Sequence, residues 1–212
     1  MKQSALLIID MQNDFVEGGA LPVTGGLSIV PIINNLIHKS LEKQFRIIAT
    51  KDYHPEGHIS FEKNKHLYEN EEFESYLKYQ EPYFWPAHCV QGTKGVEMVP
   101  GLDIQHIEAY FHKGMDILMD AYSAFFSNGK VINNYFIEDY LEKHDVGTIY
   151  ICGLAEDFCV YNNAIDARKL GYEVYLIQDA TKPVFIDKEQ ETLNNYRAVG
   201  VKIITSADFM KL

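Results

Sequence analysis

The sequence lacks the features that define several classes of protein. No run approaches the roughly 18 apolar residues that a membrane span requires, and the opening MKQSALLIID is too short for the apolar core of a secretion signal. The 3 cysteines have no regular spacing, which argues against the disulfide framework of small secreted domains. We therefore expect a soluble, cytoplasmic protein whose thiols are reduced.

Positive charge is also scarce. The 19 Lys and Arg face 30 Asp and Glu, which gives a net charge of −11. Nucleic acids and anionic membranes attract dense fields of Lys and Arg, so neither is expected as a partner, whereas a small neutral ligand or a cation is compatible. Hydrophobic residues make up 47% of the chain, enough for one sizeable core, and we expect a single domain over residues 1–212.

Short apolar runs alternate with amphipathic segments along the chain. This alternation predicts βαβ units around a parallel sheet, and hence an α/β fold. The predicted strands are Ala5–Ile9, Phe45–Ala49, Ala109–His112, Thr148–Cys152, Glu173–Ile177 and Lys202–Thr205. The predicted helices are Leu27–Ser40, Val131–Lys143, Cys159–Leu170 and Lys188–Val199. Gly171 and Gly200 are placed to end the last two helices, and Asp187 with Gln190 resembles a capping box.

One connection is too long for this pattern. About 55 residues separate the second and third predicted strands, where a featureless loop rarely exceeds about a dozen. Residues at about 62–82 mix charges with aromatics, and 71–79 favour a short helix. We interpret this insert either as a solvated excursion or as a lid or subunit contact, the latter compatible with a homo-oligomer.

Reactive side chains stand where predicted strands end. Ligands of parallel sheets bind beyond the carboxyl ends of the strands, where Asp10, Asp52, Lys113 and Cys159 are expected to meet. Asp10 is either a turn-capping residue or a general base for a thiol. Lys113 is either a surface lysine or the cation that holds the charges of Asp10 and Cys159.

The three cysteines differ in their surroundings. Free cysteines are most often inert core residues, and Cys152, inside the apolar run TIYIC, fits that description. Cys159 instead lies at a junction of strand and helix, where backbone N–H groups and the helix dipole can stabilise a thiolate and an oxyanion. We therefore consider Cys159 a candidate nucleophile.

A second group of residues suggests a metal site. Asp52 and His54 are two residues apart at a strand end, so that in an extended segment their side chains point to the same side. His58 and His88 are further candidate ligands, and Cys89 is either a ligand or a small buried residue. Carboxylate and imidazole donors suit a divalent ion such as zinc, iron or manganese.

Five motifs together resemble the nicotinamidases, members of the isochorismatase-like cysteine hydrolases. They are LLIIDMQNDFVEGGALPVTGG, ATKDYHPEGHISF, WPAHCVQGT, FHKG and GLAEDFCV, in family order over residues 5–160. The resemblance implies a doubly wound, six-stranded parallel sheet with helices on both faces. It also implies hydrolysis of nicotinamide to nicotinate and ammonia in NAD salvage, often with pyrazinamide as a second substrate.

The resemblance also implies roles for individual residues. The family's catalytic residues correspond to Asp10, Lys113 and Cys159, and its metal ligands to Asp52, His54 and His88, with one divalent ion, zinc being favoured over iron or manganese. Its oxyanion hole corresponds to the N–H groups of Ala155 and Cys159, and its substrate-binding residues to Phe15, Trp85, Tyr122 and Ala155. His58 matches a position that ligates the metal in some members of the family.

Two further expectations come from the nucleophile region. The family has a cis peptide that would lie here between Leu154 and Ala155. The family commonly has Thr-Asp where this chain has Glu156-Asp157. We expect this difference to affect the choice of substrate more than the catalytic steps.

Two alternative functions are compatible with the fold. One is a sister activity, such as isochorismatase or another amide hydrolase, although that branch generally lacks the metal residues. The other is a ligand-binding protein without catalysis, against which the presence of all three catalytic residues argues.

Overall fold

The computed structural model describes residues 2–68, 84–127, 130–131 and 137–212. Six parallel strands form one sheet in the order β3-β2-β1-β6-β7-β8. Their bounds are β1 Gln3–Ile9, β2 Arg46–Asp52, β3 Ala109–Lys113, β6 Val146–Leu154, β7 Glu173–Lys182 and β8 Lys202–Ile204. All six predicted strands are present, and the predicted α/β class is confirmed.

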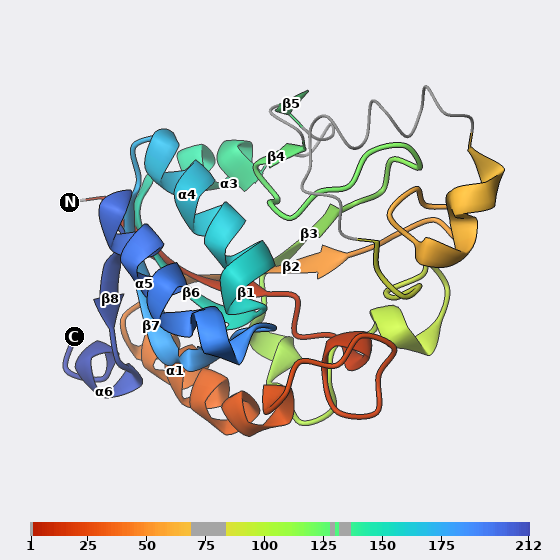
Figure 1. Cartoon of the computed structure of the whole chain (residues 1–212). Helices are drawn as coiled ribbons and strands as arrows, with labels where there is room; N and C mark the ends of the chain where they lie inside the picture. Colours follow the sequence, from red (N-terminus) through yellow and green to blue (C-terminus); the bar gives the residue numbers. More distant parts are fainter. Residues whose placement is uncertain (1, 69–83, 128–129, 132–136) are drawn as a thin grey trace.

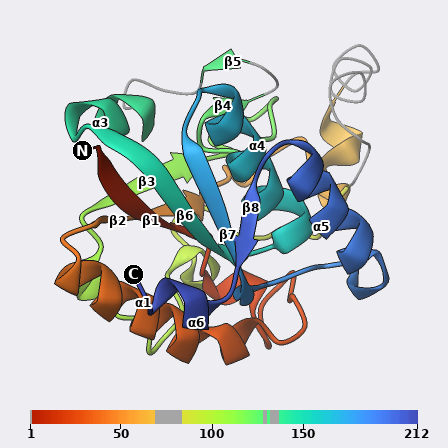
Figure 2. The same cartoon turned by 90° about the vertical axis from the view of Figure 1, so that its left-hand side faces the viewer.

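Helices cover both faces of the sheet, as the resemblance implied. On one side lie α1 (Val30–Glu42) and α6 (Ser206–Phe209), and on the other lie α3 (Ile137–Lys143), α4 (Tyr161–Lys169) and α5 (Glu189–Ala198) (Figures 1 and 2). The chain therefore winds in both directions from the centre of the sheet. Within the described residues, no helix has the length and apolar character needed to cross a membrane.

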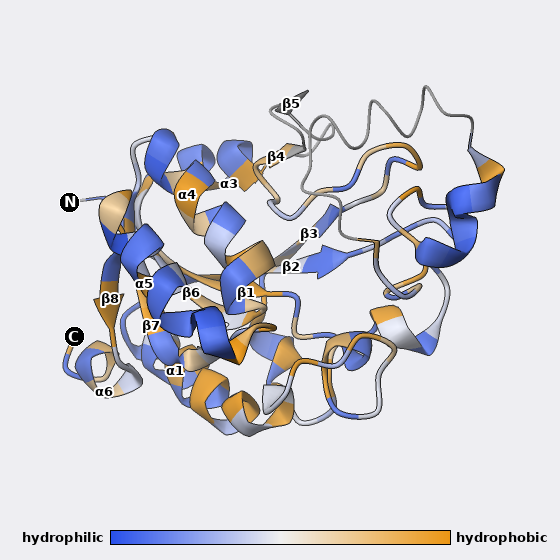
Figure 3. Ribbon diagram, viewed as in Figure 1, coloured by the Kyte–Doolittle hydropathy of each residue, from blue (hydrophilic) through white to orange (hydrophobic). Residues whose placement is uncertain are grey.

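Strand β1 explains why two separate cores form. Its side chains alternate, so Leu6 and Ile8 belong to the core beneath α1, whereas Ala5, Leu7 and Ile9 belong to the core beneath α3, α4 and α5. All five are 0% exposed. Burying an aliphatic side chain of this size contributes about 1.5–3 kcal/mol, which fixes β1 at the centre. The hydrophobic colour is concentrated in the central strands, whereas the end of β2 is polar (Figure 3).

The strand order reverses beside β1, where the sequence places the candidate catalytic residues, and such a reversal is called a switch point. From β1 the chain proceeds outward through β2 and β3, then returns to place β6 on the other side of β1. Sheets of this kind bind ligands where the order reverses, because the loops there diverge and leave a crevice. The carboxyl ends of β1 and β6 flank this crevice, and they lead into Asp10 and the Cys159 turn.

Short elements complete the described residues. They are η1 Asn13–Phe15, η2 Gly26–Ile29, η3 Glu62–Leu67, η4 Lys94–Val96, η5 Ile104–His106, η6 Glu156–Val160, η7 Ile186–Lys188 and the antiparallel pair β4 Phe126–Ser127 and β5 Lys130–Val131. The insert begins with η3, and the helix predicted over 71–79 lies outside the described residues.

Three local predictions need correction. The helix predicted from Val131 is wrong at its start, because Val131 lies in β5 and α3 begins at Ile137. The helix predicted from Cys159 begins later, at Tyr161 in α4, and Cys159 itself lies within η6. No capping box forms at Asp187, because η7 precedes α5 and the cap of α5 is Lys188; a capping box occurs instead at Thr205 and Asp208, before α6.

Candidate active site

The structure brings Asp10, Lys113 and Cys159 together beneath the switch point. Lys113 Nζ lies 2.8 Å from Asp10 Oδ2 and 3.2 Å from Cys159 Sγ, and it also pairs with Asp52 Oδ1. Asp10 and Lys113 are 0% exposed and Cys159 is 5% exposed. Asp10 directly follows β1, Lys113 ends β3 and Cys159 lies in the turn after β6, so the sheet brings the three residues together.

The charges in this group hold one another in place. Burial disfavours the ammonium of Lys113, but Asp10 and Asp52 outweigh that effect and keep its pKa well above the usual value. Burial raises the pKa of Asp10, and the nearby Lys113 only partly opposes this. Burial likewise raises the pKa of the Cys159 thiol, against the attraction of Lys113. A protonated thiol therefore lies beside a carboxylate whose basicity is increased, which suits proton transfer between them.

Neighbouring polar groups fix the orientation of the two aspartates. Thr50 Oγ1 donates to Asp10 Oδ1 at 2.7 Å. The backbone N–H of Asp52 donates to Gln12 Oε1 at 2.8 Å, and Gln12 Nε2 donates to the Asp52 carbonyl at 2.8 Å. Asp10 itself has a φ of 46°, a left-handed conformation that is unusual outside glycine. A residue that several hydrogen bonds keep in such a rare backbone conformation is typical of a functional site.

The turn that carries Cys159 is built from several unusual backbone features. The Leu154–Ala155 peptide bond is cis, and η6 closes with a hydrogen bond from Val160 N–H to the Ala155 carbonyl at 3.0 Å. Asn163 on α4 donates to the Cys159 carbonyl at 2.8 Å. Gly153 has a φ of 113°, and a Cβ there would overlap the backbone of Ile9. These contacts hold the Cys159 turn directly against β1.

Asp52, His54 and His88 form a group with the chemistry of a metal site. Asp52 Oδ2 lies 3.6 Å from His54 Nε2 and 3.7 Å from His88 Nε2. These separations exceed a hydrogen bond but fit atoms that share an ion at bonds of about 2 Å. His54 Nδ1 lies 2.8 Å from the Gly114 carbonyl and His88 Nδ1 lies 2.8 Å from the Pro86 carbonyl. Each ring thus donates from Nδ1 and turns the lone pair of Nε2 toward Asp52, the usual arrangement of metal-binding histidines.

His58 lies outside that group of three. Its Nδ1 is 2.7 Å from Ser60 Oγ and its Nε2 is 3.1 Å from the Met119 carbonyl. Burial and the neighbouring His54 lower the pKa of His58 to about 4. His54, His58 and Asp120 form a second group of buried potential ligands within 4.8 Å of one another. In this structure, however, both nitrogens of His58 contact polar groups of the protein.

The two remaining cysteines lie in the core. Cys152 and Cys89 are both 0% exposed and pack in the cluster beneath α1. Cys89 belongs to none of the potential metal groups among the described residues. Its backbone is engaged instead, because Cys89 N–H donates to Asp14 Oδ2 at 2.7 Å and its carbonyl accepts from His54 N–H at 3.0 Å. The backbone of Cys89 therefore helps to place His54.

The loop after β3 offers a direct test of the metal group. Gly114 has a φ of 64°, and a Cβ there would overlap the ring of His54 at Cε1 and Nδ1. Gly114→Ala should therefore displace His54 and weaken the affinity of this group for a divalent metal ion by about tenfold or more, the effect typical of disturbing groups behind a metal ligand. The measurement is a competitive zinc titration against a chromogenic chelator.

Gly92→Ala is the matched control for that substitution. Gly92 has a φ of 76°, yet a Cβ there would meet nothing within 4 Å. This variant carries similar backbone strain without the overlap, so it should keep its zinc affinity. If both variants lost zinc equally, backbone strain and not the position of His54 would be responsible.

An aromatic pocket lies above the reactive group. It is lined by Phe15, Trp85, Tyr122 and Ala155, with Cys159, Asp52 and His88 also at its wall. Trp85 Nε1 donates to Tyr122 Oη at 3.0 Å, which fixes two of the aromatic walls against each other. Such a narrow apolar slot with a few convergent polar groups fits a small flat ring.

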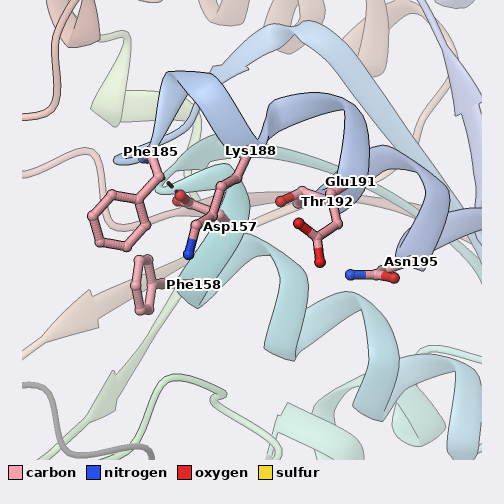
Figure 4. Close-up of a pocket in the computed structure, with 7 residues that line it drawn as sticks. All are labelled: Asp157, Phe158, Phe185, Lys188, Glu191, Thr192 and Asn195. Carbon is pink, nitrogen blue, oxygen red and sulfur yellow. Dashed lines mark hydrogen bonds between the residues drawn. The ribbon is translucent and has the colours of Figure 1, made fainter.

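A second cavity, of about 230 Å³, lies on the outer side of the Cys159 turn. Its walls include Phe158, Phe185, Lys188 and Glu191 (Figure 4). Asp157 also lines it, but its carboxylate accepts from the N–H groups of Val184 and Phe185 at 2.9 and 2.8 Å. Asp157 therefore ties the turn to the segment before α5, and this cavity contains none of the predicted catalytic residues.

Sequence reasoning missed some contributors to the site. Phe158 lines the aromatic pocket and contacts Trp85 with a ring-centroid distance of 5.2 Å. Its position next to Cys159 was the available signal. Gln12 and Thr50, which hold the aspartates, gave no signal because polar residues near strand ends are common. Asp120 approaches His54 and His58 only through a loop whose path the sequence does not reveal.

The fold and this site define a class: α/β proteins with a buried aspartate, lysine and cysteine beside a group of potential metal ligands. The isochorismatase domain family matches residues 4–208, and the chain belongs to that family. It is 37% identical to a nicotinamidase of Escherichia coli over 99% of this chain and 98% of the relative.

Solved structures agree with this assignment. A nicotinamidase/pyrazinamidase of Acinetobacter baumannii superposes with a TM-score of 0.85 at 34% identity, covering 98% of each chain. A pyrazinamidase of Pyrococcus horikoshii, solved in complex with zinc, superposes with a TM-score of 0.79 at 36% identity, covering 96% of this chain and 99% of that one.

Proposed function

We propose that the protein is a nicotinamidase that hydrolyses nicotinamide to nicotinate and ammonia, and pyrazinamide as a second substrate, through a thioester on Cys159. The observation that carries the proposal is the position of Lys113 Nζ, 2.8 Å from Asp10 and 3.2 Å from Cys159 at the wall of an aromatic pocket. The similarity to nicotinamidases over nearly the whole chain supports the substrate. Residues 1–212 would act as one hydrolase domain carrying the insert at about 62–82.

Acylation begins with proton transfer from Cys159 to Asp10. The thiolate sulfur attacks the carboxamide carbon, forming the C–S bond while the carbonyl electron pair moves to oxygen. The N–H groups of Ala155 and Cys159 receive that oxyanion, at about 3 kcal/mol each for donors of this kind. Asp10 then returns the proton to the nitrogen, the C–N bond breaks and ammonia leaves.

Deacylation uses the same groups in the same order. Asp10 takes a proton from water as the water oxygen attacks the thioester carbon, and the C–S bond breaks as the tetrahedral intermediate collapses. Asp10 returns its proton to the sulfur, and the acid product gives up its remaining proton to solvent and leaves as nicotinate. Lys113 stays charged throughout, since Asp10 and Asp52 keep its pKa far above neutrality, and its charge balances Asp10 and the thiolate in turn.

Asp52, His54 and His88 would hold one divalent ion, with zinc favoured. The imidazole and carboxylate donors, the orientation of both rings and the zinc-bound relative support this assignment. When bound, the ion supplies a fixed attachment for the pyridine nitrogen and so helps to orient the carboxamide toward Cys159. Phe15, Trp85 and Tyr122 would enclose the ring, and Phe158 extends this wall.

Ammonia release from nicotinamide, before and after chelation, tests the proposal. The purified protein should release ammonia, lose at least about 90% of the activity on chelation and regain it with zinc, because the ring is then held again. Metal analysis of the same preparation should give one ion per chain when the protein is active. Metal-loaded protein that releases no ammonia would point instead to a sister amidase or a binding protein.

Two histidine substitutions, one at the metal group and one outside it, accompany that experiment. His88→Ala should lower bound zinc and activity together. His106→Ala, on η5 and outside the metal groups, should change neither. Equal loss of zinc in both variants would contradict the assignment of His88.

A further inference from the structure

Glu156 is a buried acidic residue in the Cys159 turn, here also called the nucleophile turn. The proposed catalytic steps do not use its side chain. It is 0% exposed and lies between Ala155 and Cys159 along η6. Glutamate is rarely buried this completely unless it is paired with a cation. Its nearest polar contact is the hydroxyl of Thr181, a neutral group.

The hydrogen bonds around this carboxyl group indicate its protonation state. Glu156 Oε2 lies 2.6 Å from Thr181 Oγ1, and the same hydroxyl oxygen lies 2.8 Å from the Gln178 carbonyl. A hydroxyl has one hydrogen to donate, and the carbonyl can only accept. With Glu156 ionised, two acceptors compete for that hydrogen. With Glu156 protonated, its O–H donates to Thr181 and the Thr181 hydroxyl donates to Gln178, so every contact is satisfied.

The other carboxyl oxygen supports the same state. Glu156 Oε1 is buried and has no hydrogen-bond partner within the described part of the chain. An unpartnered carboxylate oxygen is far more costly to bury than the carbonyl oxygen of a neutral acid. The surrounding charges agree: Asp157 on the same turn and Glu189 on α5 disfavour ionisation, and Lys182 at the end of β7 opposes them. Burial, the largest effect, raises the pKa of Glu156 to about 7.

The contact with Thr181 joins the nucleophile turn to its neighbour in the sheet. Thr181 lies opposite Gly153 in the pairing of β6 with β7. On the other side, Tyr196 of α5 donates to the Glu156 carbonyl at 2.6 Å. Glu156 is thus held from β7 through its side chain and from α5 through its backbone. Any shift of Glu156 would move Ala155 and Cys159, whose N–H groups are placed for the oxyanion.

We propose that Glu156 is a neutral carboxylic acid that positions the nucleophile turn, and that its ionisation loosens the contact with Thr181 and displaces the N–H groups of Ala155 and Cys159. The kinetic part of this inference rests on the proposed function, whereas the stability part is independent of it. The folded-state pKa of Glu156 is raised above its ordinary value of 4.5. Its contribution to stability is therefore complete below about pH 4.5 and is lost as the pH rises through about 7.

Glu156→Gln tests the proposal, because the amide keeps the shape, donates to Thr181 and cannot ionise. Between pH 5 and 8, the midpoint of thermal unfolding should fall by about 5 °C more in the wild type than in the variant. The ratio of kcat for nicotinamide, variant over wild type, should rise by about threefold or more from pH 6 to pH 8. Parallel pH profiles of unfolding for the two proteins would overturn the proposal.

Two further variants complete the experiment. Glu191→Gln neutralises an exposed carboxylate on α5 and should follow the wild-type pH profile. Thr181→Val removes the hydroxyl whose hydrogen bond to Glu156 differs between the neutral and the ionised state, so the pH of the wild-type inflection should shift. If Glu156→Gln did not fold, an unmoved inflection in Thr181→Val would reject the proposal. Absence of turnover in every protein would count against the proposed function and leave the unfolding comparison decisive for Glu156.

Discussion

Cys159→Ala should lower the turnover of nicotinamide by about 10⁴-fold or more, because removal of the nucleophile from a covalent mechanism leaves only binding and oxyanion stabilisation. The substitution removes a single sulfur at a site where Cys159 contacts Lys113. The metal ligands and the aromatic residues Phe15, Trp85 and Tyr122 lie on other elements, so zinc content and nicotinate binding should persist. Steady-state ammonia release, with zinc analysis and calorimetric titration of nicotinate, measures all three quantities.

Cys152→Ala is the matched control for Cys159→Ala. Cys152 is also buried, but it lies within β6 and packs in the core beneath α1. The control should lose about 1 kcal/mol of stability from the small cavity and keep its turnover. Retention of more than about a hundredth of wild-type turnover by Cys159→Ala would exclude a thioester. Acid-quenched wild type should in turn carry an acyl adduct on Cys159, detectable by mass spectrometry.

Lys113→Met should abolish activity and also destabilise the fold by about 3–5 kcal/mol, because removal of one partner leaves buried charge without compensation. Lys113 pairs with both Asp10 and Asp52, and all three are essentially inaccessible to water. Methionine has a similar length and shape to lysine. The loss of stability therefore reflects the removal of the charge more than a change in side-chain volume. Urea unfolding of the metal-loaded proteins gives the change in the free energy of unfolding.

A second substitution separates charge from packing in that experiment. Asp10→Asn added to Lys113→Met removes one of the two stranded carboxylates, so it should restore at least about 1 kcal/mol of stability without restoring activity. Lys51→Met, a partly exposed lysine on β2, should change the free energy of unfolding by less than about 0.5 kcal/mol. If the double variant were no more stable than Lys113→Met, the destabilisation would come from packing and not from charge.

The sequence predicted the strands well, but it misplaced the start of one helix and the cap of another. Runs such as LLII and TIYIC contain no charged residue, because helices cover both faces of the central strands and bury the side chains on each face. Continuous runs of this kind are typical of strands in a parallel sheet. The start of α3 was misplaced because Val131 favours a strand as much as a helix, and it lies in β5. The capping pattern at Asp187 was overridden by η7, which occupies the place where the cap was expected.

The residues at strand ends were predicted from their position, and the resemblance then selected among the alternative roles that their chemistry allowed. Asp10, Asp52 and Lys113 each follow an apolar run, and a parallel sheet brings such residues to one edge. The unexpected details are side-chain contacts from segments far apart in the chain. Phe158 forms a wall of the pocket and contacts Trp85, and the buried carboxyl group of Glu156 contacts Thr181, 25 residues away.

The sequence by itself determined the class of fold, the reactive residue types and their order along the chain, because apolar periodicity and residue chemistry are local properties. Only the tertiary structure decided that Lys113 lies between Asp10 and Cys159, that His54 and His88 turn their Nε2 atoms toward one carboxylate, and that the buried carboxyl group of Glu156 contacts the neutral hydroxyl of Thr181. These facts depend on strand order and on packing between segments as far apart in the chain as β1 and β6. Distances, burial and pKa values arise from such non-local contacts, so they follow from the fold.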